Sequence, residues 1–213
     1  MIIAAILNNQ DQYRDSDCED IKTWKAHVPE WLHEYRNVFS KNKSERMPIW
    51  KPYDHIIDFV EGAILPKLAK VYLLSLAERN SLDMWIDEEL RKGYIQPSTS
   101  PIAALFFFVK KYDGNLQPVM DYRALNGITI KNCYPISRIA DLIESLSKVS
   151  IFTKIDLRWE YNNVCIKEED EWKTAFITRQ GLFEVTVMYF GFSNAPATFQ
   201  NMMNDILGDL ICI

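Results

Sequence analysis

One aspartate at the end of an apolar strand is the feature of this sequence with the clearest chemical meaning. Residues 150–157 have the composition of a buried strand, and Asp156 stands near its end. A carboxylate held on a rigid strand beside a cleft is a good ligand for a hard cation. The same position also suits a carboxylate that caps the following turn, and the strand alone favours that structural role.

Other polar and aromatic side chains that could serve a site occur in two further segments. Tyr161 follows Asp156 by five residues, and residues 190–200 predict a turn that leads into a helix with several small residues. Small residues there allow close packing of the backbone or the approach of a ligand to it, and packing is the more common reason. Asp121 and Arg123 could form a buried ion pair, which is favoured, or Arg123 could contact phosphate. The three histidines lie in the first 55 residues, so no catalytic triad is indicated.

The elements that would position these residues follow from local signals. A helix is predicted over residues 21–39 by its apolar spacing, and another from Ser75 to Lys92, with a capping box formed by Ser75 and Glu78 and with Gly93 as its end. Its expected core face is Leu82, Trp85, Ile86 and Leu90. Two hairpins are expected. One joins strands at 103–111 and 116–122, and the other joins strands at 172–177 and 182–188. Short helices are expected at 136–146 and after Ser193 or Asn194, either of which can cap the last helix. Pro196 is tolerated in the first turn of that helix, and its core face is Phe199, Met202, Met203, Ile206 and Leu210. This mixture of hairpins and helices indicates an α+β fold.

Composition and charge narrow the class of protein. The 213 residues are 48% hydrophobic and 25% charged, which excludes a largely disordered or low-complexity chain. The longest apolar run, residues 102–109, is too short to cross a bilayer, which needs about 20 residues. Four scattered cysteines and an N-terminus without a basic segment predict an intracellular protein, cytoplasmic or nuclear, that is not secreted.

The net charge of −5 argues against nucleic-acid binding by the whole surface. Residues 91–131 nevertheless hold six basic and two acidic side chains. Such a segment is typical of a localised phosphate site, although a solvated face is favoured on charge alone.

Taken together in order, seven motifs resemble the reverse transcriptase of gypsy-type long-terminal-repeat retrotransposons, in a fungal-like variant. The motifs are PSTSP at 97–101, FVKKYDG at 108–114, DYRALN at 121–126, YPI at 134–136, FTKIDLR at 152–158, DEWKTAF at 170–176 and GFSNAPATFQ at 191–200. The resemblance covers about residues 44–213. It implies a right-hand polymerase fold, with fingers at about 63–130 and 164–194 and palm at about 131–163 and 195–213. Residues 44–62 would be a linker into that domain, preceded by a helical or poorly ordered segment over 1–43.

The resemblance also implies roles for individual residues in template-directed DNA synthesis with two Mg²⁺ ions. Asp156 matches the first metal-binding aspartate, and the carbonyl of Leu157 would be a second ligand. Tyr161 matches the aromatic ring that excludes a ribose 2′-hydroxyl. Nucleotide contacts would come from Lys111, or else Lys110, and from Phe190 and Gly191, while Arg123 would lie near the template strand. The implied partners are an RNA or DNA template-primer and deoxynucleotides, and no membrane.

The sequence departs from the family pattern in ways that predict an inactive polymerase. The other two metal carboxylates of the family belong to a Tyr-x-Asp-Asp hairpin, and no two aspartates are adjacent in these 213 residues. Gln117 replaces an expected arginine, Glu160 replaces a small residue beside the phosphates, and Pro118 removes a strand donor. Two alternatives stay open: a nucleic-acid-binding module without catalysis, and a structural partner of a full-length polymerase.

Overall fold

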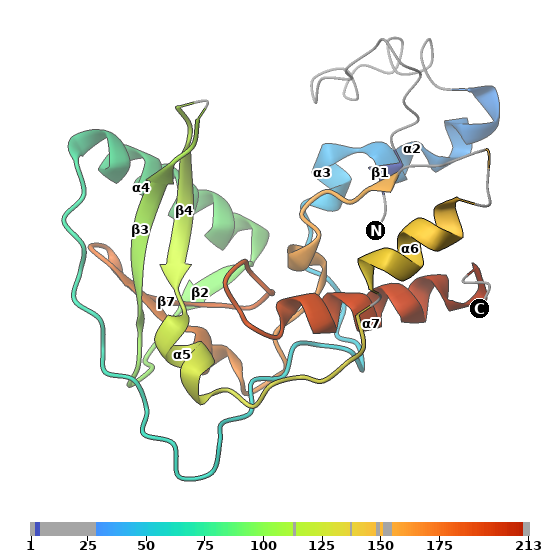
Figure 1. Cartoon of the computed structure of the whole chain (residues 1–213). Coiled ribbons are helices and arrows are strands. Elements are labelled where there is room, and N and C mark those ends of the chain that lie inside the picture. The colour runs from blue at the N-terminus through green and yellow to red at the C-terminus, as the bar shows by residue number, and fades with distance from the viewer. Residues whose placement is uncertain are drawn as a thin grey trace. The chain divides into compact units, whose positions relative to one another are not determined.

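The computed structural model of the chain describes residues 3–4, 29–112, 114–136, 138–147, 150 and 155–210. These residues form two compact units (Figure 1). One unit comprises Met1–Arg46 and Ser137–Glu160, and the other comprises Met47–Ile136 and Tyr161–Ile213. Of residues 44–62, expected as a linker, residues 47–62 belong to the second unit, where His55 and Ile57 are each only 1% exposed.

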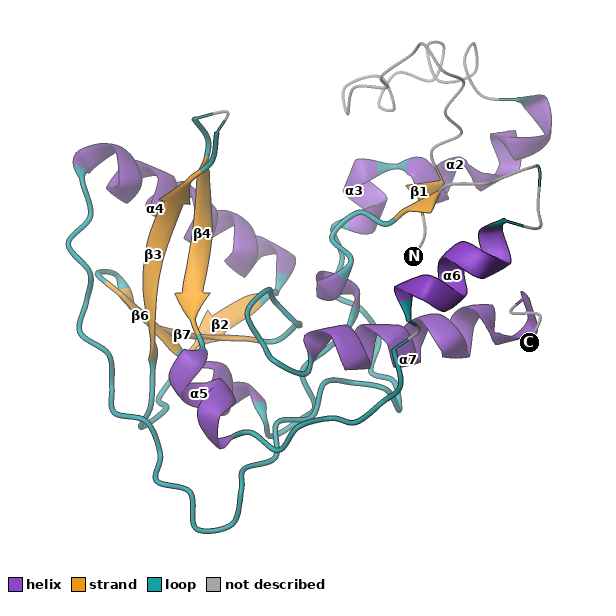
Figure 2. Cartoon of the chain, viewed as in Figure 1, coloured by secondary structure: helices purple, strands orange, loops and turns teal. Residues whose placement is uncertain are grey.

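The second unit is built on a five-stranded mixed sheet with strand order β2-β7-β6-β3-β4 (Figure 2). Its strands are β2 (Ile95–Pro97), β3 (Ala104–Lys110), β4 (Leu116–Asp121), β6 (Phe176–Thr178) and β7 (Gly181–Val185). Pairing is antiparallel except between β3 and β6, which run parallel. The α+β class predicted from the sequence is therefore confirmed.

Strands β3 and β4 form the first predicted hairpin. The N–H of Lys111 donates to the carbonyl of Asn115 at 2.8 Å, and Gly114 has a φ of +85° that glycine adopts without strain. Pro118 pairs with Phe108, but β4 is an edge strand of the sheet. Proline is tolerated on edge strands, so the loss of its N–H is less costly here than in a central strand.

Helix α4 (Leu76–Lys92) has the bounds and both of the caps that were predicted for it. The Ser75 side chain accepts from the Glu78 N–H, the Glu78 carboxylate accepts from the Ser75 N–H, and Gly93 ends the helix at a φ of +76°. Leu82 and Ile86 are buried, and the Trp85 ring lies 5.3 Å from that of Phe106 on the sheet. Leu90 was expected in the core and is instead 38% exposed, because the turn containing Glu89 and Lys92 is buried in its place.

Three further elements complete the second unit, and one prediction there is wrong. Residues 172–174 belong to a 3-10 turn, η4 (Glu171–Thr174), rather than to a strand, because the Thr174 hydroxyl accepts from the Val185 N–H and so takes the place of a backbone ladder partner. Helix α5 (Arg123–Ile128) follows β4 directly and was not predicted. Helix α7 (Ala195–Leu207) begins where it was expected, with Pro196 in its first turn.

On α7 the core face is displaced toward the helix N-terminus relative to the prediction. Met202 is buried, and Phe199 and Met203 pack against the core, but Ile206 is 46% exposed. Ala197 and Thr198 are buried instead. The short turn η5 (Gly208–Leu210) follows this helix.

The first unit contains short helices and a two-stranded pairing. Its elements are β1 (Ile3–Ala4), η2 (Glu30–Tyr35), α2 (Arg36–Phe39), α3 (Lys41–Ser44), α6 (Ile139–Leu146) and β5 (Ile155–Asp156). The predicted helix over 21–39 is found as η2 and α2, and residues 21–28 lie outside the described residues. Within the predicted strand 150–157, residues 151–154 also lie outside them, and β5 pairs antiparallel with β1.

In the part of the chain that the structure describes, no helix is long and apolar enough to cross a bilayer.

Candidate nucleotide site

Three aromatic side chains from separate segments meet in the second unit. Tyr161 lies in the 3-10 turn η3 (Tyr161–Asn163), Phe190 lies in the loop after β7, and Phe199 lies in α7. The Tyr161 ring meets that of Phe190 edge-on at 4.8 Å between centroids and that of Phe199 at 5.7 Å. Phe190 stays 57% exposed, so this cluster presents an aromatic surface to solvent. The structure therefore brings together Tyr161 and Phe190, which the sequence analysis assigned to one pocket.

The loop that carries Phe190 turns sharply at Gly191. Its φ of +106° is a conformation that residues with a Cβ rarely adopt. A Cβ at this position would also lie 3.4 Å from Tyr122 Cδ2 and 3.5 Å from the Met120 carbonyl. Glycine is therefore favoured by the backbone conformation, whereas the space beside it would admit a Cβ at ordinary contact distance.

The same loop is held to α5 by the side chain of Asn126. Its Nδ2 donates to the Gly191 carbonyl at 2.7 Å, and its Oδ1 accepts from the Ser193 N–H at 2.9 Å. Lys131 Nζ adds hydrogen bonds to the Asn126 carbonyl at 2.7 Å and to Ser193 Oγ at 3.0 Å. One amide side chain therefore fixes two backbone groups of the loop, on Gly191 and Ser193.

Asn194, at the end of the same loop, holds it to the segment that contains Ile130 and Asn132. It was one of two residues, with Ser193, expected to cap α7; it is the N-cap residue, but its side chain makes no capping hydrogen bond. Its Nδ2 donates instead to the Ile130 carbonyl at 2.8 Å, and its Oδ1 accepts from the Asn132 N–H at 3.1 Å. Local sequence could not predict these hydrogen bonds, because the partners, Ile130 and Asn132, lie more than 60 residues away in sequence.

The loop residue Phe192 packs against buried rings, which support the loop. The ring of Phe192 stacks on that of Tyr122 at 4.3 Å and lies 5.2 Å from that of His55. The Tyr122 hydroxyl donates to the Thr174 carbonyl at 2.8 Å. Burial raises the pKa of Tyr122, so the hydroxyl remains a donor at any ordinary pH.

His55 joins the residues 47–62 to α7 beneath the site. Its Nδ1 is 3.0 Å from Thr198 Oγ1, and its ring is buried. Burial lowers the pKa of His55 from 6.5 to about 4, against the opposing effect of Asp170. A neutral imidazole is therefore built into this core, and it supplies a packing contact rather than a proton-transfer group.

The predicted phosphate-binding lysines lie at the other end of the hairpin from this loop. Lys110 pairs with Leu116 next to the turn, whereas Leu105 pairs with Asp121 at the end near Gly191. Five residues of strand separate Leu105 from Lys110, which is about 17 Å at 3.4 Å per residue. Lys110 and Lys111 are exposed, and the structure does not bring them to the aromatic cluster.

Arg123 is paired with Asp121, as the sequence favoured, but the pair is not buried. Arg123 Nε donates to Asp121 Oδ1 at 2.8 Å and its NH2 group to Oδ2 at 2.6 Å, while the arginine side chain is 90% exposed. The Arg123 side-chain hydrogen bond lowers the pKa of the Asp121 carboxyl. The guanidinium thus keeps one edge in solvent at the first residue of α5.

Several basic side chains of the segment 91–131 already form ion pairs or hydrogen bonds within the fold. Lys92 is 3% exposed in its side chain and forms ion pairs with Glu88 at 2.7 Å and Glu89 at 3.1 Å. Lys131 donates to the Asn126 carbonyl and to Ser193 Oγ, and Arg123 forms an ion pair with Asp121. The positive charge available to a phosphate backbone is therefore smaller than the composition of the segment suggests.

Asp156 and Leu157 belong to the first unit. Asp156 is the last residue of β5 and pairs with Ile3 of β1, and Leu157 follows it. The side chain of Asp156 lies outside what the structure describes, so its role as a metal ligand stays a prediction, as does that of the Leu157 carbonyl. Among the described side chains, no group of three or more His, Cys, Asp or Glu could hold a metal ion.

Known proteins resemble this chain in sequence. Residues 109–212 match the family described as reverse transcriptase (RNA-dependent DNA polymerase). The chain is 35% identical over 185 residues to the retrovirus-related Pol polyprotein from transposon 297 of Drosophila melanogaster, covering 84% of this chain and 17% of that protein. It is 33% identical over 186 residues to the transposon Tf2-3 polyprotein of Schizosaccharomyces pombe, covering 85% and 14%. The chain thus spans less than a fifth of the length of either relative.

Solved structures show the same fold at lower sequence identity. The crystal structure of a prototype foamy virus protease-reverse transcriptase aligns with 97% of this chain and 28% of that one, at a TM-score of 0.61 and 21% identity. The foamy viral protease-reverse transcriptase in complex with an RNA/DNA hybrid aligns with 97% of this chain and 29% of that one, at 0.63 and 20%. The polymerase fold expected from the sequence motifs is confirmed by these matches.

Proposed function

We propose that this chain, which carries a reverse transcriptase domain of the kind found in retrotransposon polyproteins, supplies the nucleotide pocket of a gypsy-type RNA-directed DNA polymerase. The observation that carries the proposal is the cluster of Tyr161, Phe190 and Phe199 beside the Gly191 turn. Aromatic rings held by buried packing can exclude a sugar substituent by shape, because the packed interior behind them does not yield.

In this proposal Tyr161 is the ring that excludes a ribose 2′-hydroxyl. Its edge rests on Phe199 of α7, which packs against the core, so it cannot retreat without disturbing that packing. Phe190 and Gly191 form the floor for the nucleotide, and Asn126 keeps that floor in position. Lys111, or else Lys110, would reach the triphosphate, which requires movement of the hairpin toward the site.

The proposed template contact is Arg123 at the start of α5. Its exposed edge can donate to a phosphate while Asp121 holds its other edge. One solved relative is a foamy viral enzyme bound to an RNA/DNA hybrid, which supports a template-primer as the partner. Deoxynucleotides are the proposed second substrate.

Magnesium is the proposed cofactor, with Asp156 and the Leu157 carbonyl as the ligands from this chain. Two such ions would clamp the attacking and leaving oxygens of nucleotidyl transfer. One carboxylate and one carbonyl do not make a complete two-ion site, which needs several oxygen ligands per ion. These 213 residues contain no adjacent pair of aspartates, and we therefore propose that they do not extend a primer by themselves.

Nucleotide discrimination by the isolated chain tests the proposed pocket. The protein with an annealed RNA template and DNA primer should bind the matched deoxynucleotide more tightly than the ribonucleotide, measured by isothermal titration calorimetry. Tyr161→Ala should remove that preference, and Tyr72→Ala, a half-exposed tyrosine outside the cluster, should keep it. A wild-type chain that binds both nucleotides equally, or neither, would overturn the proposal.

Primer extension tests the proposed inactivity separately. Incubation with Mg²⁺ and the four deoxynucleotides should leave the primer unextended. Extension that disappears in Asp156→Asn would show that the chain is an active polymerase, while the assignment of the nucleotide pocket would stand.

A binding module without catalysis is the second candidate, and it rests on Lys110 and Lys111 at the hairpin. Both are exposed and adjacent in sequence. Binding to single-stranded nucleic acid should weaken with salt at a log–log slope of about −0.7 for each phosphate contacted. Replacing both lysines by glutamine should reduce that slope, and the absence of binding at low salt would exclude this function.

Association with a full-length polymerase is a third proposal and would make the chain a structural partner. The apolar side chains exposed on α6 support it, and they are Ile139 at 76%, Ile143 at 62% and Leu146 at 52%. Apolar surface of this kind is common at sites of protein association. A chain that stays a monodisperse monomer in analytical ultracentrifugation, alone and mixed with the polymerase, would count against it.

A further inference from the structure

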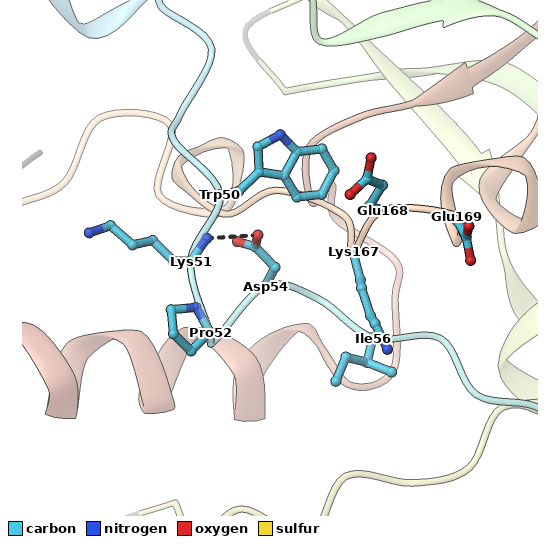
Figure 3. Close-up of a pocket in the computed structure, with 8 residues that line it drawn as sticks. All are labelled: Trp50, Lys51, Pro52, Asp54, Ile56, Lys167, Glu168 and Glu169. Carbon is cyan, nitrogen blue, oxygen red and sulfur yellow. Dashed lines mark hydrogen bonds between the residues drawn. The ribbon is translucent and has the colours of Figure 1, made fainter.

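Glu89 of helix α4 is a buried acid that has no part in the proposed function. Four acidic side chains are buried among the described residues, and they are Asp54, Glu89, Asp170 and Glu184. Acidic side chains are almost never fully buried unless they are paired. Asp54 lies in the wall of a pocket, where its carboxylate accepts from the Lys51 N–H at 2.9 Å (Figure 3). Glu89 differs from it, because its partner, Tyr189, directly precedes a residue of the nucleotide site.

Both oxygens of the Glu89 carboxylate form hydrogen bonds inside the second unit. Oε2 accepts from the Tyr189 hydroxyl, and Oε1 accepts from Lys92 Nζ at 3.1 Å. The Lys92 side chain is 3% exposed and also forms an ion pair with Glu88 at 2.7 Å. A satisfied buried network of this kind holds its members rigidly in place.

Tyr189 joins this network to the loop of the nucleotide site. Its ring packs edge-on against that of Trp85 at 6.4 Å between centroids, and it lies against the core. Burial, and then the negative charge of Glu89, raise the pKa of Tyr189, so its hydroxyl keeps its proton and remains a donor. Without Glu89 this hydroxyl would lose its acceptor, and a buried donor without a partner is costly. The Tyr189 side chain is then expected to move toward water or another acceptor.

Phe190 is joined to Tyr189 by a single peptide group, so a displacement of one displaces the other. On its other side Phe190 is followed by Gly191, whose carbonyl accepts from Asn126 at 2.7 Å. The Phe190 ring is 57% exposed and meets the Tyr161 ring edge-on at 4.8 Å. Packing around the ring therefore confines it only in part, and its place depends on the backbone at both ends.

We propose that Glu89 is a positioning residue for the nucleotide pocket, because its hydrogen bond with Tyr189 fixes the backbone that leads into Phe190. The proposal rests on the proposed function and extends it from the aromatic cluster to helix α4. Glu89 acts through Tyr189 and sets how the Phe190 ring meets Tyr161. The deoxynucleotide preference of the pocket therefore depends on an acid that lies outside the aromatic cluster.

A ring resonance of Phe190 tests the positioning without any nucleotide. The chain is labelled with ¹³C in its phenylalanine rings, and the Phe190 signal is assigned by its loss in Phe190→Leu. Glu89→Leu should shift or broaden this signal, because it removes the acceptor of Tyr189. Glu89→Gln keeps an amide oxygen that can accept from the same hydroxyl, and it should leave the signal near its wild-type position.

Thr186→Val is the matched control for a purely structural effect. Thr186 is 8% exposed and directly follows β7, and its hydroxyl donates at 2.6 Å to the carbonyl of Gly93 at the end of α4. The variant thus removes one buried hydrogen bond between α4 and the segment after β7, as Tyr189→Phe does. Both variants should lower the urea midpoint of unfolding, whereas only Tyr189→Phe should move the Phe190 signal, besides adding a ring signal of its own.

The nucleotide preference is measured by the same calorimetric comparison of deoxynucleotide and ribonucleotide that tests the pocket. In Glu89→Leu and in Tyr189→Phe the ratio of the two affinities should fall by about threefold or more. Glu89→Gln and Thr186→Val should keep the wild-type ratio. If Glu89→Leu fails to fold, Tyr189→Phe takes its place, since it keeps the ring and removes the same hydrogen bond.

Four results would overturn the proposal. They are an unmoved Phe190 signal in a folded Glu89→Leu or Tyr189→Phe, an equal movement in Thr186→Val, an equal effect of Glu89→Gln and Glu89→Leu, and a moved ring with an unchanged nucleotide ratio. A wild-type chain without any nucleotide preference would overturn the proposed function instead, and the Phe190 signal would still decide whether Glu89 positions the ring.

Discussion

Replacing Asn126 by alanine should loosen the loop that carries Phe190 and Gly191 while leaving the rest of the second unit folded. Asparagine at this position makes both side-chain hydrogen bonds to the loop backbone, at 2.7 Å to the Gly191 carbonyl and at 2.9 Å from the Ser193 N–H. Alanine removes both bonds. The bond from Lys131 Nζ to the Asn126 carbonyl remains, because it involves the backbone.

The size of the effect follows from the number and exposure of these bonds. A hydrogen bond contributes about 0.5–1.5 kcal/mol net, and two would contribute about 1–3 kcal/mol. Because this side chain lies at the surface, water replaces part of what is lost, and we expect about 1–2 kcal/mol. That corresponds to an increase of about 5–30-fold in the open state of the loop.

Hydrogen exchange at the Ser193 amide measures this opening directly, since that N–H is the donor to Asn126. Its protection should fall by about 5–30-fold in Asn126→Ala, while amides in β3 and β7 keep their protection. Asn80→Ala is the matched control, because Asn80 is an exposed residue on α4. Alanine has the higher helix propensity, so this control should be neutral or slightly stabilising.

Unchanged protection at Ser193 in the Asn126→Ala variant would refute the reasoning. It would mean that Asn194 and the packing of Phe192 hold the loop without the amide clamp. A loss of protection throughout the sheet would also refute it, because the clamp would then be a global rather than a local constraint.

Three further predictions concern stability, measured as the free energy of unfolding in urea. Leu82→Ala should cost about 2.7–5 kcal/mol because Leu82 is 0% exposed, whereas Met84→Ala on the same helix, at 67% exposure, should cost less than about 1 kcal/mol. Ser75→Ala should cost about 0.5–2 kcal/mol through the lost capping box, and near-zero cost would show that α4 is held by packing alone. Stability should fall as pH drops from 6.5 toward 4, because the unfolded chain protonates His55 at 6.5 and the folded chain only at about 4. The loss is up to about 3 kcal/mol, and His55→Gln should flatten this pH dependence; an unchanged slope would contradict it.

Local signals in the sequence predicted the elements whose determinants lie within a few residues. The capping box at Ser75 and the glycine after Lys92 set the two ends of α4, and both ends were predicted correctly. The turn at Gly114 likewise set the register of the β3–β4 hairpin. In each case the hydrogen-bond partners are neighbours in sequence, so the local sequence pattern is enough to predict the structure.

Contacts between distant segments decided the features that were predicted wrongly or not at all. The strand expected over 172–177 is shortened because Thr174 bonds to Val185. Residues 47–62 look like a linker by composition, yet His55 is buried against Thr198, 143 residues away. Neither partner can be identified from local composition, because only the folded chain sets which distant groups meet.

The sequence by itself determined the α+β class and the family resemblance, since ordered motifs and hydrophobic periodicity can be read without coordinates, and that resemblance implied that Tyr161 and Phe190 lie near one another. Tertiary structure alone decided that Asn126 and Asn194 hold the loop that contains Gly191, and that Lys92 is buried in ion pairs with Glu88 and Glu89. The physical reason is that a polar group forms a hydrogen bond or an ion pair only with the groups that folding brings within about 3 Å of it.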